Sequence, residues 1–580
     1  MESLPYENLV HIFSHLTFSE KRNLASTCKK WHALIMNSYL LYTDFQIHNE
    51  LNYSLFKNYF LQKSNNNQDV RNLYLSFTYI ETAELLALLE HFPKLQELDW
   101  EDHVDIDLDL VNEENAKYWR KITRFTETGH VPLSTKILQY NGFCNLIELD
   151  VNFHGSDDCD LLVQQLSKAP KLAVLTFRNG EMFLSDLAQL QQNTPNLESL
   201  ELYEMELMEA SDDNDDVDET ATTSSGSSMT ERRINATNVA TSNKLKQVEI
   251  NDYTIDRYRG FLAYVALNYK NLETLTIHRD KNSEEAFLSR TNPAHLIAIA
   301  SNCPRLVSYD VDIHPITAAV LKEMDLNGIR MKRMRISPYR NSLLTQQIKD
   351  ILESDQKNFI ETMVIDCSCP SFFPSKHTDS KKDDISKRRS ELFASLQKFP
   401  KLKHVEMIGK YNCQGHLLAD FPFDELLKPL NEHLKIIKLV NWNMSLAAVN
   451  DRRFEAKKLR DLILVDVNIN NANEKVMPFV SKTCQNLSKL TIKRTIQHDK
   501  TYMIECPGHR FTCITLNWKA IEGRQYYYNV NKNVWYTVDD GVLQTTCSEP
   551  PESVEHPTVS LDYSSCTSLR IGNAYVYNNF

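Results

Sequence analysis

A short apolar phrase recurs along most of this chain at intervals of about 25 residues, and no other feature limits the fold as strongly. Each copy has a turn residue, often proline, then an apolar residue at position one and further apolar residues at positions four and six; 93–100 and 170–177 are two examples. Such self-similarity predicts an array of stacked units rather than one closed core. Position one falls at Val70, Leu95, Leu146, Leu172, Leu197, Leu245, Leu272, Leu306, Met331, Ile360, Leu402, Leu434, Leu459, Leu487 and Phe511.

Between these copies the apolar period changes from two residues to about 3.6, which indicates amphipathic helices. In segment 82–92, Leu85, Leu86, Leu88 and Leu89 share one helical stripe, and Thr82 stands at the expected N-cap. Each unit is therefore a strand, a turn and a helix, and it must stack because neither element buries its apolar face alone. Comparable helices are predicted at 160–168, 184–193, 260–268, 294–301, 316–325, 390–399 and 423–431.

Two segments interrupt the array, and the tail departs from it. Residues 204–243 include the aspartate-rich stretch 211–219 and a Ser/Thr-rich run, so they are expected to form a disordered acidic insertion. Residues 370–388 are expected to form a second, charged insertion. The stretch 46–69 is interpreted as a linker. The tail 518–580 loses the phrase and is β-rich, which predicts a cap with a hairpin turn at 531–533.

The phrase resembles the leucine-rich repeat of the longer, cysteine-containing type that occurs in F-box proteins. The resemblance covers residues 70–517 and departs from the family at position nine, which rarely carries the Asn or Cys that links neighbouring turns. It implies an α/β solenoid in the form of a horseshoe, with parallel strands on its concave side. The register is open at 101–145 and 366–398, where the phrase fits poorly.

The first 45 residues, called the head below, form a separate pattern. Pro5 suits the first turn of a helix, where its missing N–H costs nothing. A core this small is not expected to be robust alone, so part of its apolar surface should await a partner. Two helical stripes are predicted, with Leu9, Ile12, Phe13 and Leu16 on the first and Leu24, Cys28 and Trp31 on the second.

The head resembles an F-box, which shares its Leu-Pro start, the following glutamate and the apolar positions of both stripes. Asn8, Asn23 and Tyr42 depart from the residues that are frequent in the family. The resemblance implies a three-helix domain that binds the Skp adaptor and, through it, cullin. The alternative is an ordinary helical cap on the solenoid. The adaptor-binding residues that the resemblance implies are Leu4, Pro5, Leu9, Ile12, Phe13, Leu16, Leu24, Cys28 and Trp31.

Strand positions three, five and seven should point to the concave side, because strand side chains alternate. Their charges predict a surface that is acidic in the early repeats and locally basic beyond, which would steer a partner with a basic segment. The alternative is a solvated face with no partner. The candidate substrate-binding residues are Glu97, Asp99, Glu148, Asp150, Glu249, Asp310, Arg333 and Arg335.

Composition and motifs exclude several functions. A net charge of −13 disfavours general nucleic-acid binding. No stretch has the roughly 20 apolar residues of a membrane span, and the start lacks a secretory pattern. The 12 cysteines have no framework spacing, which indicates reduced thiols in the cytoplasm or nucleus.

Phosphate-loop, dinucleotide, hydrolase and zincin motifs do not occur. Neither Cys367, Cys369 and His377 nor Cys506, His509 and Cys513 have paired zinc knuckles. We therefore expect no cofactor, metal or catalytic residue.

The sequence thus predicts a non-catalytic substrate receptor of a Skp–cullin–F-box ubiquitin ligase, with an unidentified protein substrate. The alternative is an interaction scaffold that uses the same head and repeats without ubiquitin transfer.

Overall fold

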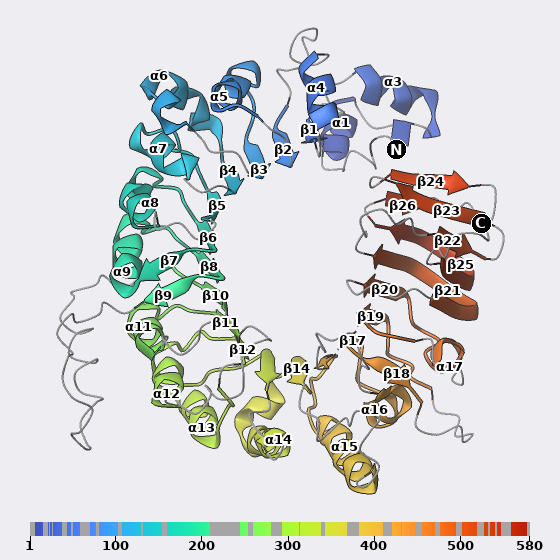
Figure 1. Cartoon of the computed structure of the whole chain (residues 1–580). Coiled ribbons are helices and arrows are strands. Elements are labelled where there is room, and N and C mark those ends of the chain that lie inside the picture. Colours follow the sequence, from blue (N-terminus) through green and yellow to red (C-terminus); the bar gives the residue numbers. More distant parts are fainter. Residues whose placement is uncertain are drawn as a thin grey trace, which may run out of the picture. The chain divides into compact units, whose positions relative to one another are not determined.

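The computed structural model divides the chain into two compact units, Met1–Leu306 and Val307–Phe580, which are described separately (Figure 1). The structure describes all residues except 1–5, 15–20, 22–23, 26, 38–42, 48–49, 59–69, 77–79, 102–106, 129–131, 154–158, 209–243, 253–258, 280–292, 313, 338–342, 368–381, 410–419, 431, 447–454, 470–475, 495–501, 519–526, 532–533, 540–541, 547–557, 573 and 577–580.

The first unit begins with the head helices α1 (Tyr6–Ser14) and α3 (Lys29–Asn37) and continues as one parallel sheet. Its strands pair in chain order, except that β7 and β9 form a separate pair. The strands are β1 (Asp44–Ile47), β2 (Asn72–Ser76), β3 (Glu97–Glu101), β4 (Arg124–Thr128), β5 (Glu148–Asn152), β6 (Val174–Arg178), β7 (Glu181–Phe183), β8 (Ser199–Tyr203), β9 (Glu206–Met208), β10 (Gln247–Asp252) and β11 (Thr274–Arg279).

Helical segments follow the strands and cover one face of this sheet, as Figure 1 shows. We call the opposite face of the sheet, which none of the described helices covers, the open face. The helices are α4 (Glu50–Phe56), α5 (Thr82–His91), α6 (Glu113–Ala116), α7 (Leu133–Gln139), α8 (Cys159–Gln165), α9 (Leu184–Asn193), α11 (Arg259–Asn268) and α12 (Pro293–Asn302), with short 3₁₀ turns η4 (Leu108–Leu110), η5 (Lys117–Lys121) and η6 (Leu166–Lys168).

The second unit repeats this arrangement and ends in a mixed sheet. Its parallel strands are β12 (Ser308–Val311), β13 (Arg333–Ile336), β14 (Thr362–Asp366), β15 (His404–Ile408), β17 (Ile436–Val440), β19 (Asp461–Val465), β20 (Lys489–Arg494), β21 (Tyr502–Trp518) and β25 (Thr558–Ile571). Strands β16 (Asp420–Pro422) and β18 (Asn443–Ser445) form a separate pair. The helical segments are α13 (Ala318–Leu326), α14 (Leu343–Glu353), η9 (Asp355–Asn358), α15 (Lys382–Leu396), α16 (Phe423–Leu430) and α17 (Val476–Thr483).

The tail adds β22 (Tyr527–Val530), β23 (Val534–Asp539), β24 (Val542–Thr546) and β26 (Ala574–Val576). Strands β22 and β23 pair antiparallel around Asn531, which confirms the predicted hairpin. Strand β25 pairs parallel with β21, with Ile514 opposite Leu569. The parallel ladder therefore continues into the segment that the sequence assigned to the cap.

The repeat phrase accounts for the core. Every residue assigned to position one is buried, from Val70 to Phe511. Positions four and six are buried as well, so strands such as β5 alternate between buried and half-buried residues. Helix α5 buries the predicted stripe Leu85, Leu86, Leu88 and Leu89. The prediction of Thr82 as its N-cap is wrong, because Glu81 precedes the helix and Thr82 Oγ1 accepts from Asp107 N at 3.0 Å instead.

Two polar ladders link the repeats in place of the position-nine ladder. The first ladder uses asparagines that directly precede position one. The side-chain amide of each asparagine donates to a backbone carbonyl in the turn of the preceding repeat: Asn145 Nδ2 to Arg120 O at 2.7 Å and Asn196 Nδ2 to Pro170 O at 2.6 Å. The second ladder uses position eight, which has positive φ in several repeats, including Asn179 (52°). Its backbone N–H donates to the backbone carbonyl of position seven in the next strand, as Asn179 N does to Tyr203 O. Both ladders use groups that would otherwise be unpaired at the sheet edges.

The structure adds two repeats that the sequence analysis missed. Ile122 is buried at position one of β4, which fills the stretch 101–145. Position six of this repeat is Glu127 instead of an apolar residue, so the phrase is broken there. The second additional repeat contains β1, which carries Phe45 and Ile47 and pairs with β2. This strand crosses the predicted domain boundary at residue 45. Helix α4 follows, so 46–69 is not simply a linker.

Both predicted insertions are shorter than expected. Strand β9 lies within 204–243 and pairs with β7, while 209–243 lie outside the described residues. Helix α15 begins at Lys382 rather than near residue 390, so it includes the end of the charged segment 370–388. Its charged first turns precede an apolar stripe of Leu392, Phe393 and Leu396, all buried. Lys387 and Arg388 are exposed on this helix, whereas Arg389 pairs with Glu425 at 2.6 Å, so part of a helix was mistaken for a loop.

Candidate functional site

The head is built around its own small core. Leu9 and Phe13 of α1 are 1% exposed and pack with Leu34 and Ile35 of α3. The Phe13 ring meets Trp31 edge to face, with 5.6 Å between ring centroids. Two of the residues expected to contact the adaptor, Leu9 and Phe13, are thus covered by the head itself. Their observed role is to hold the two helices together.

Ile12, on the same helix α1, is 41% exposed. Asn8, one helical turn earlier, is exposed as well, as are Lys29 and Ala33 of α3. Leu24 and Trp31 are half-buried and pack against the head core. Among the described residues of the head, Ile12 is thus exposed to solvent, and Val10, Leu24 and Trp31 are partly accessible. An exposed apolar side chain suits docking against another protein.

Cys28 acts within the head. Its Sγ accepts a hydrogen bond from Trp31 N at 3.4 Å at the start of α3, where backbone N–H groups lack helical partners. Leu4, Pro5 and Leu16 were also expected to bind the adaptor, and they lie outside the described residues.

The head is fixed to the sheet by a buried cation. Lys21 is 1% exposed, and its Nζ donates to Thr43 Oγ1 at 3.1 Å and to Asp44 Oδ2 at 3.3 Å. Asp44 lies on β1 and accepts from Asn72 Nδ2 of β2 at 2.5 Å. Burying an ammonium group is tolerated only when it is paired and hydrogen-bonded. This contact sets the orientation of the head on the first strands. Sequence analysis missed it, although a lysine within an apolar helical pattern was a visible signal.

The open face of the first unit carries carboxylates, of which some are neutralised. Asp150 binds Arg178 through two hydrogen bonds of 2.9 and 3.0 Å, and the Arg178 guanidinium lies 4.4 Å from the centre of the Tyr203 ring. Glu148 pairs with Arg124 at 2.7 Å. The sequence analysis named the acids but missed these two arginines. Of the other expected residues, Glu97 and Asp99 are half-buried on β3.

Glu201 and Glu249 lie side by side on this face, in register on β8 and β10. Burial and the Glu249 charge raise the pKa of Glu201. Tyr203 Oη donates to Glu201 Oε2 at 3.2 Å, and Asn251 Nδ2 donates to Glu249 Oε1 at 3.2 Å. Like charges directly opposite on neighbouring strands repel each other, so a cation placed between them would relieve that repulsion.

In the second unit the expected basic patch is a network of ion pairs. Asp310 is 4% exposed and binds Arg333 Nη2 at 2.8 Å and also Arg335 Nε. Glu406 binds Lys438 at 2.7 Å and lies 3.8 Å from Arg333. Opposite charges alternate here across neighbouring strands. Arg333 and Arg335 are therefore not an uncompensated basic surface, and the predicted basic patch is wrong at these two residues.

The cysteine and histidine groups considered for zinc are used separately. His509 Nε2 lies 2.6 Å from Leu487 O, and Cys506 Sγ lies 4.0 Å from Met477 O. Cys369 and His377 lie outside the described residues. Among the residues that the structure describes, no three His, Cys, Asp or Glu side chains gather as a metal site would require. None of the helices in that same part of the chain has the length and apolar character needed to cross a bilayer.

Comparison with known proteins identifies the head. The family model described as F-box-like matches residues 1–47. No curated protein matches the sequence at a significant level. Among solved structures, an internalin (InlF) from Listeria monocytogenes is similar, with 15% identity over 67% of this chain and 85% of that chain and a TM-score of 0.28. The TLR13–ssRNA13 complex has 10% identity, covering 78% of this chain and 61% of that chain, with a TM-score of 0.36.

The chain thus carries an F-box-like domain at its N-terminus, followed by parallel sheet of the leucine-rich-repeat type.

Proposed function

We propose that this protein is the substrate-receptor subunit of a Skp–cullin–F-box ubiquitin ligase in the cytoplasm or nucleus. Its F-box-like head binds the Skp adaptor, and its repeats hold a protein substrate. The observation that carries the proposal is the F-box-like match over residues 1–47, on a head that leaves Ile12 in solvent. An architecture of this kind is typical of ligase components that catalyse nothing themselves.

The buried contact between the head and the first strands supports this role. Because Lys21 fixes the head to β1 and β2 through Asp44, the adaptor and the first repeats keep a defined separation. A substrate held on those repeats would then stay within reach of a ubiquitin-conjugating enzyme elsewhere in the complex. Tethering of this kind raises the effective concentration of the substrate lysine without a catalytic group on this chain.

The open face of the first unit is the substrate surface that we favour. The adjacent carboxylates Glu201 and Glu249 would accept a lysine or arginine of the substrate, with Glu97, Asp99 and Glu148 along the same face. The pair of Asp150 with Arg178 reduces the net negative charge beside them. Charge reversal at Glu201 and Glu249 should weaken substrate binding, whereas reversal at the exposed Glu114 on the helical side should not.

Co-purification of the full-length protein tests the proposal. Recovery of both the Skp adaptor and cullin, together with ubiquitin transfer to a bound protein, is the expected result. Recovery of the adaptor without cullin would favour the scaffold alternative, and recovery of neither would overturn both.

A further inference from the structure

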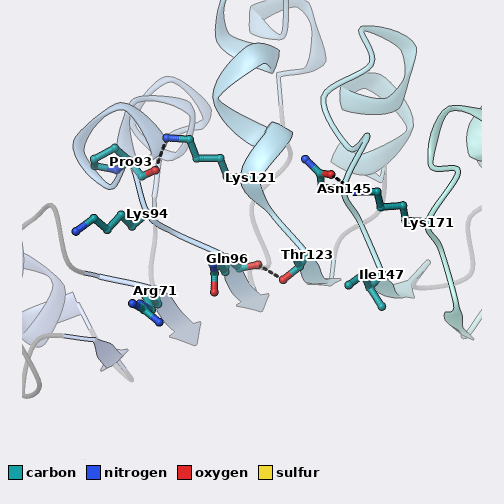
Figure 2. Close-up of a pocket in the computed structure, with 9 residues that line it drawn as sticks. All are labelled: Arg71, Pro93, Lys94, Gln96, Lys121, Thr123, Asn145, Ile147 and Lys171. Carbon is teal, nitrogen blue, oxygen red and sulfur yellow. Dashed lines mark hydrogen bonds between the residues drawn. The ribbon is translucent and has the colours of Figure 1, made fainter. Parts of the chain in front are cut away.

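A shallow groove lies along the edge of the first sheet where strands β2 to β6 begin, and it encloses about 500 Å³ (Figure 2). Its lining comes from the residues just before or at the start of each strand in five consecutive repeats. It is distinct from the open face, because strand positions three, five and seven do not line it. The lining residues are Arg71, Pro93, Lys94, Gln96, Lys121, Thr123, Asn145, Ile147 and Lys171.

All the charged side chains that line this groove are basic. Four of its nine lining residues are Lys or Arg, and none is Asp or Glu. Lys121 Nζ donates to Pro93 O at 2.5 Å, and Lys171 Nζ donates to Asn145 Oδ1 at 2.7 Å, so both have uncharged partners (Figure 2). Among the residues that the structure describes, Arg71, Lys121 and Lys171 form no ion pair with a carboxylate.

Two lysines at the same edge of other repeats are neutralised, whereas Lys244 donates to an uncharged group, Asn196 Oδ1. Lys246 binds Glu198 at 2.7 Å, and in the second unit Lys403 binds Glu361 at 2.9 Å. Compensation by a carboxylate therefore differs from lysine to lysine along this edge, and among the described residues Arg71, Lys121 and Lys171 of the groove lack it. In a chain of net charge −13, the cations Arg71, Lys121 and Lys171 create a local field that attracts anions.

The dimensions of the groove suit an extended peptide. Neighbouring strands lie about 4.8 Å apart, so the distance from β2 to β6 is about 19 Å, or roughly six residues of extended chain. Ile147, which is 46% exposed, lies among the cations and offers one apolar contact. Anionic side chains could face the lysines while an apolar side chain between them covers Ile147.

Single-stranded nucleic acid fits less well. Proteins that bind it stack bases on aromatic side chains, and the lining contains none. The groove is also too small for a duplex.

We propose that this groove binds an extended, acidic segment of a partner protein, with Lys121 and Lys171 contacting its anionic side chains and Ile147 an apolar one. The proposal does not rest on the ligase function, because the groove is separate from the head. It adds a second surface whose charge is opposite to that of the open face.

The test uses the full-length protein and a fluorescent eight-residue peptide of Asp and Glu with a central Leu. The groove variant Lys121→Glu/Lys171→Glu is compared with Lys246→Glu/Lys403→Glu, which changes the net charge equally at lysines that already have carboxylate partners. We expect the groove variant to bind about tenfold or more weakly and the control within about twofold of wild type. Thermal unfolding verifies that both variants are folded.

Equal losses in the two variants would show a field of the whole protein and overturn the proposal, as would no binding to the wild type. A second peptide with phosphoserine in place of Glu tests the source of the negative charge. If the groove variant weakens binding of the phosphoserine peptide by the same factor as binding of the Asp/Glu peptide, both peptides bind at the groove. Tighter binding of single-stranded RNA than of either peptide would overturn the choice of a protein partner.

Discussion

Glu127 is a carboxyl group buried where other repeats have an apolar side chain, and it makes stability depend on pH. It is 2% exposed and accepts from Leu133 N at 2.7 Å and Ser134 N at 3.2 Å, at the start of α7, and also from Ser134 Oγ. Burial raises the pKa of Glu127 to about 7, despite these hydrogen bonds. In the unfolded chain the same carboxyl group would have its ordinary pKa of 4.5.

Between these two pKa values the folded state binds more protons than the unfolded state, so stability falls as pH rises through this window. The difference between a pKa of 4.5 and a pKa of about 7 corresponds to about 3.4 kcal/mol in total, of which about 2.5 kcal/mol is lost between pH 5 and pH 8. The substitution Glu127→Gln removes the titration, because glutamine is neutral throughout.

Hydrogen exchange of the α7 amides, corrected for the intrinsic rate at each pH, measures this difference. The wild type should lose about 2.5 kcal/mol of local opening free energy from pH 5 to pH 8 relative to Glu127→Gln. The exposed Glu114→Gln provides the control and should behave as the wild type. If wild type and Glu127→Gln show the same pH dependence, the carboxyl group does not titrate in the folded state as argued.

Three further substitutions test the packing described above. Lys21→Ala leaves Asp44 without its buried cation and should lower the opening free energy of the head by about 3 kcal/mol, measured by hydrogen exchange of α1 and α3; unchanged exchange would contradict it. Asp310→Asn removes the buried carboxylate that binds both Arg333 and Arg335 and should destabilise the second unit by about 3 kcal/mol in denaturant unfolding; unchanged stability would contradict this. Gly409→Ala would place a Cβ 2.9 Å from the Trp442 ring and against the Asn441 carbonyl. We expect the free energy of unfolding of the second unit to fall by about 1–3 kcal/mol in denaturant unfolding, and a stabilised variant would refute the packing.

The repeat pattern made most of the fold predictable, because each strand and helix needs the same apolar positions in order to stack. Prediction failed where one residue broke the phrase for a local reason. At Glu127 a carboxylate that accepts hydrogen bonds from the start of α7 replaces an apolar residue, and the whole repeat at Ile122 was missed.

The candidate sites were predicted less well, because a residue type does not reveal whether its charge is compensated. Asp310, Arg333 and Arg335 occupy neighbouring strands, and comparing adjacent repeats in register could have paired them. The same comparison would have revealed the lysines at the edge of β3 to β6. In the head, helical spacing grouped Ile12 with Phe13, whereas the position of α3 leaves one exposed and buries the other.

The most direct test of the proposed function is the affinity of the purified full-length protein for the Skp adaptor when Ile12 is changed to Glu. Ile12 is 41% exposed, so the charge can be accommodated without unfolding the head. Leu326→Glu is the matched control, because Leu326 is 71% exposed on α13 of the second unit. The account predicts that Ile12→Glu weakens adaptor binding by about 100-fold or more while Leu326→Glu leaves it unchanged. Equal affinity of wild type and Ile12→Glu would contradict it.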